Sequence, residues 1–221
     1  GYMHRQSKLL AERALTFDPQ RADAYLFIGD IEYENQKLAA AEKAWKKAKA
    51  IEPQLSGLTE RLSRIDREAK VEKKYKKTSN SFFDIRYQHR IDRESASALR
   101  FAITTARKNV GQDFAYRLKH RLNVIVYSGS DFQELRLGPH WAGGLYDGKI
   151  RLPLDGKQNI DVAVATLFHE YTHAVIHDLA RGHCPRWLNE GLAEVQGRKI
   201  KQEPVRFLEK ALMAKQIIPL E

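Results

Sequence analysis

The chain has 221 residues, of which 43% are hydrophobic and 30% charged, and its formal net charge is +10. This length and balance are ordinary for a globular protein with a hydrophobic core, and no run of about eighteen apolar residues is present that could span a membrane. The single cysteine, Cys184, excludes an internal disulfide framework and a cysteine-based zinc site. The first residues have no apolar signal-peptide core, so we expect a soluble protein. Its compartment stays open between the cytoplasm and, if an upstream signal has been removed, the periplasm or cell envelope.

About half of the positive excess lies in residues 60–93, where eleven Lys and Arg face six Asp and Glu. Such a stretch can bind nucleic acid, but it is more commonly a solvated helix face. Its most basic part, EKKYKK (72–77), has one aromatic residue and no nucleic-acid motif. We therefore expect no nucleic-acid partner.

A helical repeat is predicted in the first third of the chain. Asp18-Pro19 and Glu52-Pro53 lie 34 residues apart. The spacing and pattern between them resemble a tetratricopeptide repeat, and the residues that carry this resemblance are Tyr25, Ile28, Gly29, Ala41, Trp45, Ala48 and Pro53. Gly29 and Ala41 are expected to let two helices approach closely, with Tyr25 and Trp45 in the outer layer. The resemblance implies a docking surface for a protein partner, although a structural spacer would show the same pattern.

Two further helices are predicted beside the repeat. Residues 3–17 match only the second helix of a preceding repeat, and one and a half repeats cannot bury a core alone. Residues 56–76 place apolar side chains at helical intervals, namely Leu58, Leu62, Ile65, Ala69 and Val71. We expect the repeat to lean on this long linking helix, or on further repeats upstream, so that residues 1–76 form one helical region.

Residues 76–81 are polar and are predicted to be a joint, because residues 80–221 follow a different pattern. In chain order, this second part is predicted to contain a strand at 82–88, a helix at 94–118, a strand at 122–128, strands around glycine turns at 141–154, and helices at 160–179, 187–199 and 204–215. Strands come first and helices follow, which indicates the α+β fold class and a second domain over residues 80–221.

The motif with the most specific chemistry is FHEYTH (168–173), inside the helix predicted at 160–179. His169 and His173 are four residues apart and lie on one helix face, where both imidazoles can reach one zinc ion. Glu170 is rotated about 100° from His169, which places its carboxylate beside the metal as a base for water. A polar patch on a helix is the alternative, but most of the surrounding residues are apolar or uncharged.

A catalytic zinc ion needs a third protein ligand, and the sequence offers three sources. A metzincin would have Gly at position 176 and His at position 179, where this chain has Ile176 and Leu179. His177 would require three successive turns of one helix to bind one ion, so we expect it at the surface. The remaining source is Glu190, in PRWLNEGLAEVQG (185–197), on the next predicted helix.

The order HEYTH and then WLNEGLAE resembles the gluzincin, or peptidase MA-like, zinc hydrolases, which include a bacterial branch with tetratricopeptide repeats. The resemblance covers roughly residues 80–221, and the repeat covers 20–55. It implies a compact zincin-type metallopeptidase domain that binds one Zn²⁺ per chain through His169, His173 and Glu190. It also implies that Glu194 orients His169, consistent with the helix face that Glu194 shares with Glu190.

The expected activity is hydrolysis of peptide bonds by metal-activated water, with Glu170 as general base. A peptide substrate is expected to pair with an edge strand formed by Gly143, Gly144, Leu145 and Tyr146. The alternative is that these residues form a plain hairpin turn. Enzymes of this group also stabilise the oxyanion with a Tyr or His. We expect that residue beyond position 221, or Tyr146 or His140 in its place.

A non-catalytic protein is the competing hypothesis: a peptide- or protein-binding scaffold whose peptidase-like domain holds zinc for structure or is degenerate. The presence of Glu170 favours the enzyme, because a structural zinc site has no need of a base there.

Overall fold

The computed structural model describes residues 2–88, 90–137, 143–155 and 160–201. The helices in these residues are α1 (Tyr2–Phe17), α2 (Ala22–Glu34), α3 (Leu38–Ile51), α4 (Leu58–Glu72), α5 (Arg93–Asp113), α6 (Gly129–Glu134), α7 (Ile160–Leu179) and α8 (Arg186–Lys201). The strands are β1 (Lys76–Ser79), β2 (Phe83–Tyr87), β3 (Leu122–Tyr127), β4 (Leu145–Tyr146) and β5 (Ile150–Pro153). The α+β prediction is confirmed. The helix predicted at 204–215 lies outside the described residues.

The strands form one mixed sheet in the order β1-β2-β3-β5-β4. The three inner strands are parallel, with Ile85 opposite Val124 and Val124 opposite Ile150, and the two edge strands run antiparallel to their neighbours. The prediction that residues 76–81 are only a polar joint is wrong, since Lys76–Ser79 form the edge strand β1. Its side chains are mostly exposed, as is usual for a lysine-rich edge strand.

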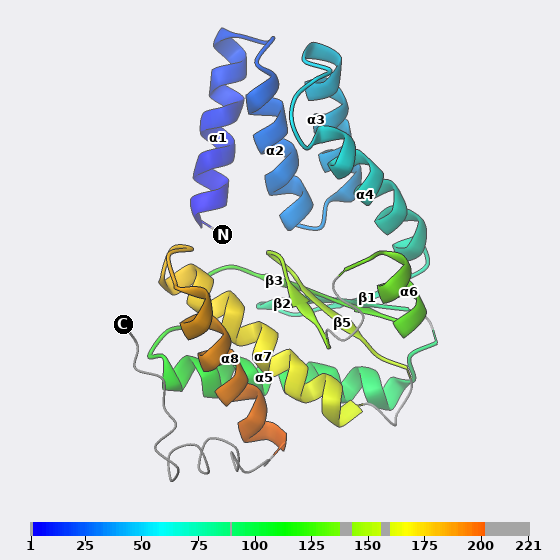
Figure 1. The fold of residues 1–221 in the computed structure, drawn as a ribbon, viewed down its shortest axis with the longest axis vertical. Coiled ribbons are helices and arrows are strands. Elements are labelled where there is room, and N and C mark those ends of the chain that lie inside the picture. Colours follow the sequence, from blue (N-terminus) through cyan, green and yellow to red (C-terminus); the bar gives the residue numbers. More distant parts are fainter. Residues whose placement is uncertain (1, 89, 138–142, 156–159, 202–221) are drawn as a thin grey trace.

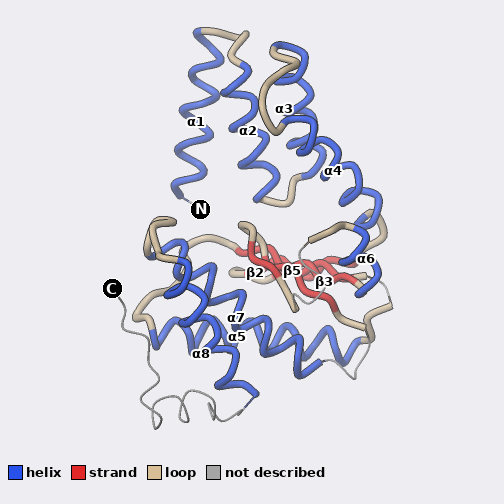
Figure 2. The backbone as a smooth tube through the Cα atoms, in the orientation of Figure 1, coloured by secondary structure: helices blue, strands red, loops and turns tan. Residues whose placement is uncertain are grey.

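Helices cover both faces of the sheet, so that the molecule has three layers (Figures 1 and 2). On one face, α5 and α7 bury the alternate strand residues Phe83, Ile85, Val124, Val126, Ile150 and Leu152. On the other face lie α6 and the helical region α1–α4, and Ile125 and Tyr127 point to that side with Phe132 of α6. None of the described helices is both long and apolar enough to cross a membrane.

The helices α2 and α3 pack closely because Gly29 has no side chain. A Cβ atom on Gly29 would lie 2.3 Å from the Trp45 indole, so any other residue would displace that ring. The close approach was predicted, but the expected outer position of Trp45 is wrong, because its side chain is only 2% exposed. The indole Nε1–H donates to Asp30, which explains how this large ring is buried without an unpaired donor.

A buried polar cluster joins the helical region to the sheet, and we call it the ionic junction. Its members are Tyr33, Gln36, Glu68 and Glu72 from the helical side and Tyr127, Lys149 and Arg151 from the sheet. The Arg151 guanidinium donates to the hydroxyls of Tyr127 and Tyr33, each at 2.7 Å, and Tyr33 donates to Glu68 at 2.5 Å. Arg151, Glu68 and Lys149 are fully buried. The helical region is therefore held to the sheet by side-chain contacts as well as by the covalent connection between α4 and β1.

The linking helix α4 buries a different residue from the one expected. Leu58 and Ile65 are buried as predicted, but Ala69 is exposed and Glu68 takes the buried position beside Ile65. The prediction for Ala69 is wrong because a carboxylate is tolerated in this interior when Arg151 and Lys149 neutralise it.

Helix α5 ends earlier than the predicted residue 118. Asp92 caps its first turn, accepting the backbone N–H of Glu94 and Ser95 at 3.0 and 2.9 Å. At the other end, Asp113 is the last helical residue, and Ala115 has the left-handed φ of 47° that breaks the helix. Residues 114–121 are therefore a loop.

Candidate metal centre

Helix α7 holds the two histidines of the FHEYTH motif at the edge of the core. On either side of them, Phe168, Tyr171, Ala174 and Val175 are buried against the sheet and α5, which fixes the rotation of the helix. His169 and His173 lie one turn apart on the face directed toward α8, and their rings meet edge-on at 4.7 Å. Their Nε2 atoms are 3.0 Å apart.

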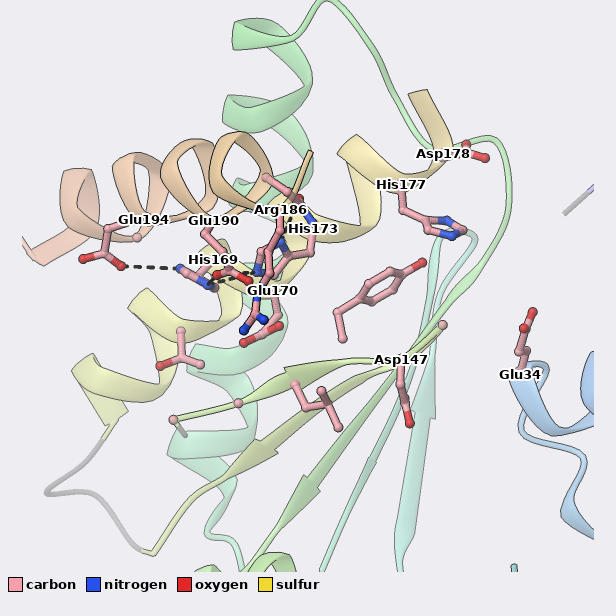
Figure 3. A pocket seen from close by; sticks show the side chains of 18 of the residues that line it. Glu34, Asp147, His169, Glu170, His173, His177, Asp178, Arg186, Glu190 and Glu194 are labelled. Atoms are coloured by element: carbon pink, nitrogen blue, oxygen red, sulfur yellow. Dashed lines mark hydrogen bonds and ion pairs between the residues drawn. The ribbon is translucent and has the colours of Figure 1, made fainter. Parts of the chain in front are cut away.

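Helix α8 brings Glu190 to the same place. The turn between α7 and α8 is short because Arg181 and Gly182 adopt left-handed φ values of 52° and 78°. The two helices then cross closely at Gly197, where an added Cβ would lie 3.3 Å from the carbonyl oxygen of Ala165. As a result, Glu190 Oε2 lies 3.7 Å from His169 Nε2 and 3.6 Å from His173 Nε2 (Figure 3).

These three donor atoms fit a tetrahedral zinc ion. Zinc bonds to nitrogen and oxygen of about 2.0–2.1 Å require ligand atoms about 3.3 Å apart, close to the observed separations. Each ligand atom of His169, His173 and Glu190 lies within 4.8 Å of the other two. Glu190 is half-exposed, whereas the histidine side chains are 23% and 12% exposed, so the cluster opens toward solvent on the Glu190 side.

The other ring nitrogens face groups that accept hydrogen bonds. His173 Nδ1 lies 2.9 Å from Asn189 Oδ1, and His169 Nδ1 lies 3.6 Å from Glu194 Oε2. Protons on both Nδ1 atoms leave the two Nε2 lone pairs directed at one another and at a carboxylate, an arrangement that a shared cation relieves. Burial, and next the neighbouring His173, lower the pKa of His169, which favours the neutral, metal-binding form.

The position of Glu194 agrees only in part with its predicted role. Its carboxylate is on the Nδ1 side of His169, but 3.6 Å is too long for a direct hydrogen bond. Its other oxygen accepts from Arg198 at 2.5 Å. Asn189, to which the sequence assigned no role, makes the shorter contact to a histidine of the cluster.

Glu170 lies beside the cluster and is only 6% exposed. Burial raises the pKa of its carboxyl to about 8, the negative charge of Glu190 adds to this, and the backbone N–H of Tyr146 opposes it by donating to the carboxylate. Gly144 makes this contact possible, since a Cβ there would lie 2.6 Å from Thr166 and 3.0 Å from Glu170. The absence of side chains at Gly143 and Gly144 therefore lets this segment lie against α7.

A cleft of about 1600 Å³ contains the cluster. One wall is the segment Gly143–Gly148, which includes the edge strand β4, and another is the exposed face of α7 and the start of α8. The third wall is the loop after α5, with Tyr116, Lys119 and His120. Sequence reasoning missed this wall, because residues 114–118, the first part of the loop, were predicted to continue the helix.

The remaining predicted residues lie apart from the cluster. His177 is exposed, as predicted, and stands beyond His173 along α7 (Figure 3). Tyr146 packs edge-on against His177, with ring centres 6.0 Å apart, and His140 lies outside the described residues.

The structure thus gathers His169, Glu170, His173 and Glu190 in one cleft, with Gly143–Tyr146 as its wall and Glu194 at its edge. Arg186, four residues before Glu190 on α8, also lines this cleft and was not predicted. Comparison of the chain with protein-family models, with curated proteins and with solved structures gives no match.

Proposed function

We propose that the protein is a zinc-dependent peptidase, in which His169, His173 and Glu190 hold the metal and Glu170 is the general base. The observation that carries this proposal is the convergence of two imidazole nitrogens and a carboxylate oxygen at 3.0–3.7 Å, in an open cleft, beside a buried carboxyl. A structural zinc site would need no such carboxyl and no cleft.

A bound zinc ion supplies Lewis acidity, which polarises a carbonyl group and makes a nearby water molecule a stronger acid. Glu170 accepts the proton of the attacking water and returns it to the leaving amine. A buried carboxyl group beside the metal suits both steps, because it can accept a proton and release it again within the cleft. The Tyr146 N–H holds this carboxylate in place.

A peptide substrate is proposed to lie along β4, the edge strand of the sheet in the cleft. One side of β4 pairs with β5, through Leu145–Arg151 and Tyr146–Ile150, and the other side faces α7. Since Glu170 already accepts the Tyr146 N–H, the substrate would pair with the other outward backbone groups of this wall. In this proposal, α1–α4 are the docking surface for a protein partner.

The test combines zinc analysis with peptide hydrolysis for the wild type, His173→Ala and Glu170→Gln. We expect one zinc ion per chain in the wild type and in Glu170→Gln, and none in His173→Ala. Hydrolysis of a mixed fluorogenic peptide library should fall about a hundredfold to ten-thousandfold in Glu170→Gln. A wild type that takes up no zinc would refute the metal site. Zinc uptake with activity indifferent to Glu170, or with no activity, would favour the non-catalytic scaffold.

A further inference from the structure

The cleft continues beyond the metal cluster in one direction. His169, His173 and His177 recur every four residues along α7, and Arg181 follows just past the end of the helix; all four line the cleft. Figure 3 shows His177 and Asp178 on the far side of His173 from Glu194. At this end the opposite walls are the Asp147-Gly148 turn and the loop that carries Lys119 and His120.

The carboxylates at this end are engaged within the protein. Asp178 accepts from the Tyr116 hydroxyl at 2.6 Å and lies 3.9 Å from His120 Nδ1. Asp147 accepts from Arg151 at 3.1 Å and from Arg64. Glu34, at the end of α2, is not free of partners either. Each of these carboxylates therefore already has an interaction within the protein.

Two cations at the same end are in a different situation. Lys119 and Arg181 are exposed and line the cleft, and no hydrogen bond or ion pair to another described residue holds either of them. Their neighbour Arg121 is instead directed to Asp84, at 3.4 Å. Lys119 and Arg181 come from separate walls, the loop after α5 and the turn after α7, so an anion between those walls could contact both.

We propose that this end of the cleft binds an acidic side chain of the peptide substrate through Lys119 and Arg181. The proposal rests on the proposed function for the placement of the peptide, and it adds the substrate class: peptides with a carboxylate at a set distance from the cleaved bond. Along α7, six residues separate His173 from the helix end at Leu179, which corresponds to about 9 Å, and Arg181 lies in the turn just beyond. An extended peptide covers about 9 Å in about three residues.

The test measures peptide binding to Glu170→Gln loaded with zinc, so that no probe is consumed. The probes are fluorescein-labelled decapeptides of one sequence, carrying Asp-Glu-Asp at one end, Asn-Gln-Asn at the same end, or Asp-Glu-Asp at the other end. We expect one of the two acidic peptides to bind about tenfold more tightly than the amide peptide, as suits two partly solvated ion pairs, and the preference to shrink at high salt.

The double variant Lys119→Gln/Arg181→Gln, made in the Glu170→Gln background, should lose this preference. The matched control is Lys73→Gln/Lys74→Gln, which removes the same charge from exposed positions between α4 and β1. The control should keep the preference, and thermal unfolding of both variants should match the parent.

Equal binding of acidic and amide peptides, no binding of either, or the same loss of preference in the control would overturn the proposal. Tighter binding of a single-stranded oligonucleotide of equal charge would overturn it in favour of a nucleic-acid site. Zinc content is measured in the same samples. An acidic preference that depends on Lys119 and Arg181 in a chain without zinc would therefore refute the peptidase and retain the acidic-peptide site.

Discussion

Two groups of charged or titratable side chains, the cluster of His169, His173 and Glu190 and the ionic junction, are built in opposite ways. In the junction, Arg151 and Glu68 are fully buried and each charge meets its partner inside the protein. In the cluster, two imidazoles and Glu190 converge at the surface of a cleft, with no lysine or arginine of the described residues in an ion pair to them. The junction therefore serves the fold, whereas the cluster is where we propose that a metal ion binds.

The largest expected difference between the two regions is the loss in the free energy of unfolding after a single substitution. Replacing Arg151 by Met should lower the free energy of unfolding by about 3–5 kcal/mol, because the fully buried Glu68 would lose its fully buried partner. Replacing His173, which lines the cleft and has 12% of its side chain exposed, by Gln in metal-free protein should change the free energy of unfolding by less than about 1 kcal/mol. Urea denaturation measures both, and similar losses would remove the distinction between the regions.

Zinc should stabilise the protein through the cluster of His169, His173 and Glu190 and not through the ionic junction. At a free zinc concentration of about 100 times Kd, binding adds about 2.7 kcal/mol to the free energy of unfolding. The melting temperature of the wild type should therefore rise with zinc and fall with a chelator. In His173→Ala it should stay constant, and a zinc-dependent rise in that variant would place the metal elsewhere.

We expect Asn189 to strengthen the zinc affinity by orienting His173, although it is not itself a ligand. Asn189→Ala removes the acceptor for His173 Nδ1, and such changes typically weaken metal affinity about tenfold to a hundredfold. Asn189→Asp keeps an acceptor oxygen and serves as the control. Competition with a chromophoric zinc chelator measures both, and equal affinities in Ala and Asp variants would show that the contact does not orient the ring.

The smallest expected effect is a pH dependence of the free energy of unfolding, which arises from Lys149 in the ionic junction. Burial, with Arg151 adding to it, lowers the pKa of Lys149 to about 7, below its ordinary value of 10.5. Between these values the unfolded chain binds the extra proton, so the free energy of unfolding should rise with pH. The rise is about 1 kcal/mol between pH 7 and 8. Lys149→Met should lack this contribution, and identical slopes in the two proteins would contradict it.

The convergence of His169, His173 and Glu190 was largely predictable because its determinants are local. The spacing of His169 and His173 is a property of one helix, and Glu190 follows after a single short turn. The positions of α7 and α8 agree with the predicted ranges within two residues for the same reason. Asn189 was missed because its contact depends on how the two helices cross.

The ionic junction was not predictable from the sequence. Arg151 and Glu68 lie 83 residues apart, and the burial of either makes sense only with the other in place. The strand β1 was missed for a related reason, since its polar residues are held by pairing with β2 rather than by their own propensity. The helix predicted to reach residue 118 overshot because the left-handed backbone at Ala115 has no strong local signal.

The junction also bears on how this chain could change in evolution. Tandem helical repeats are readily exchanged when each contacts only its neighbours. Here the helical region supplies the hydroxyl of Tyr33 and the carboxylate of Glu68 to an arginine of the sheet, and Gln36 to Lys149. A helical region from another protein would leave Lys149 without Gln36 and Arg151 without Tyr33 and Glu68. The two regions are therefore bound to be inherited together, and a recombination point between them would be selected against.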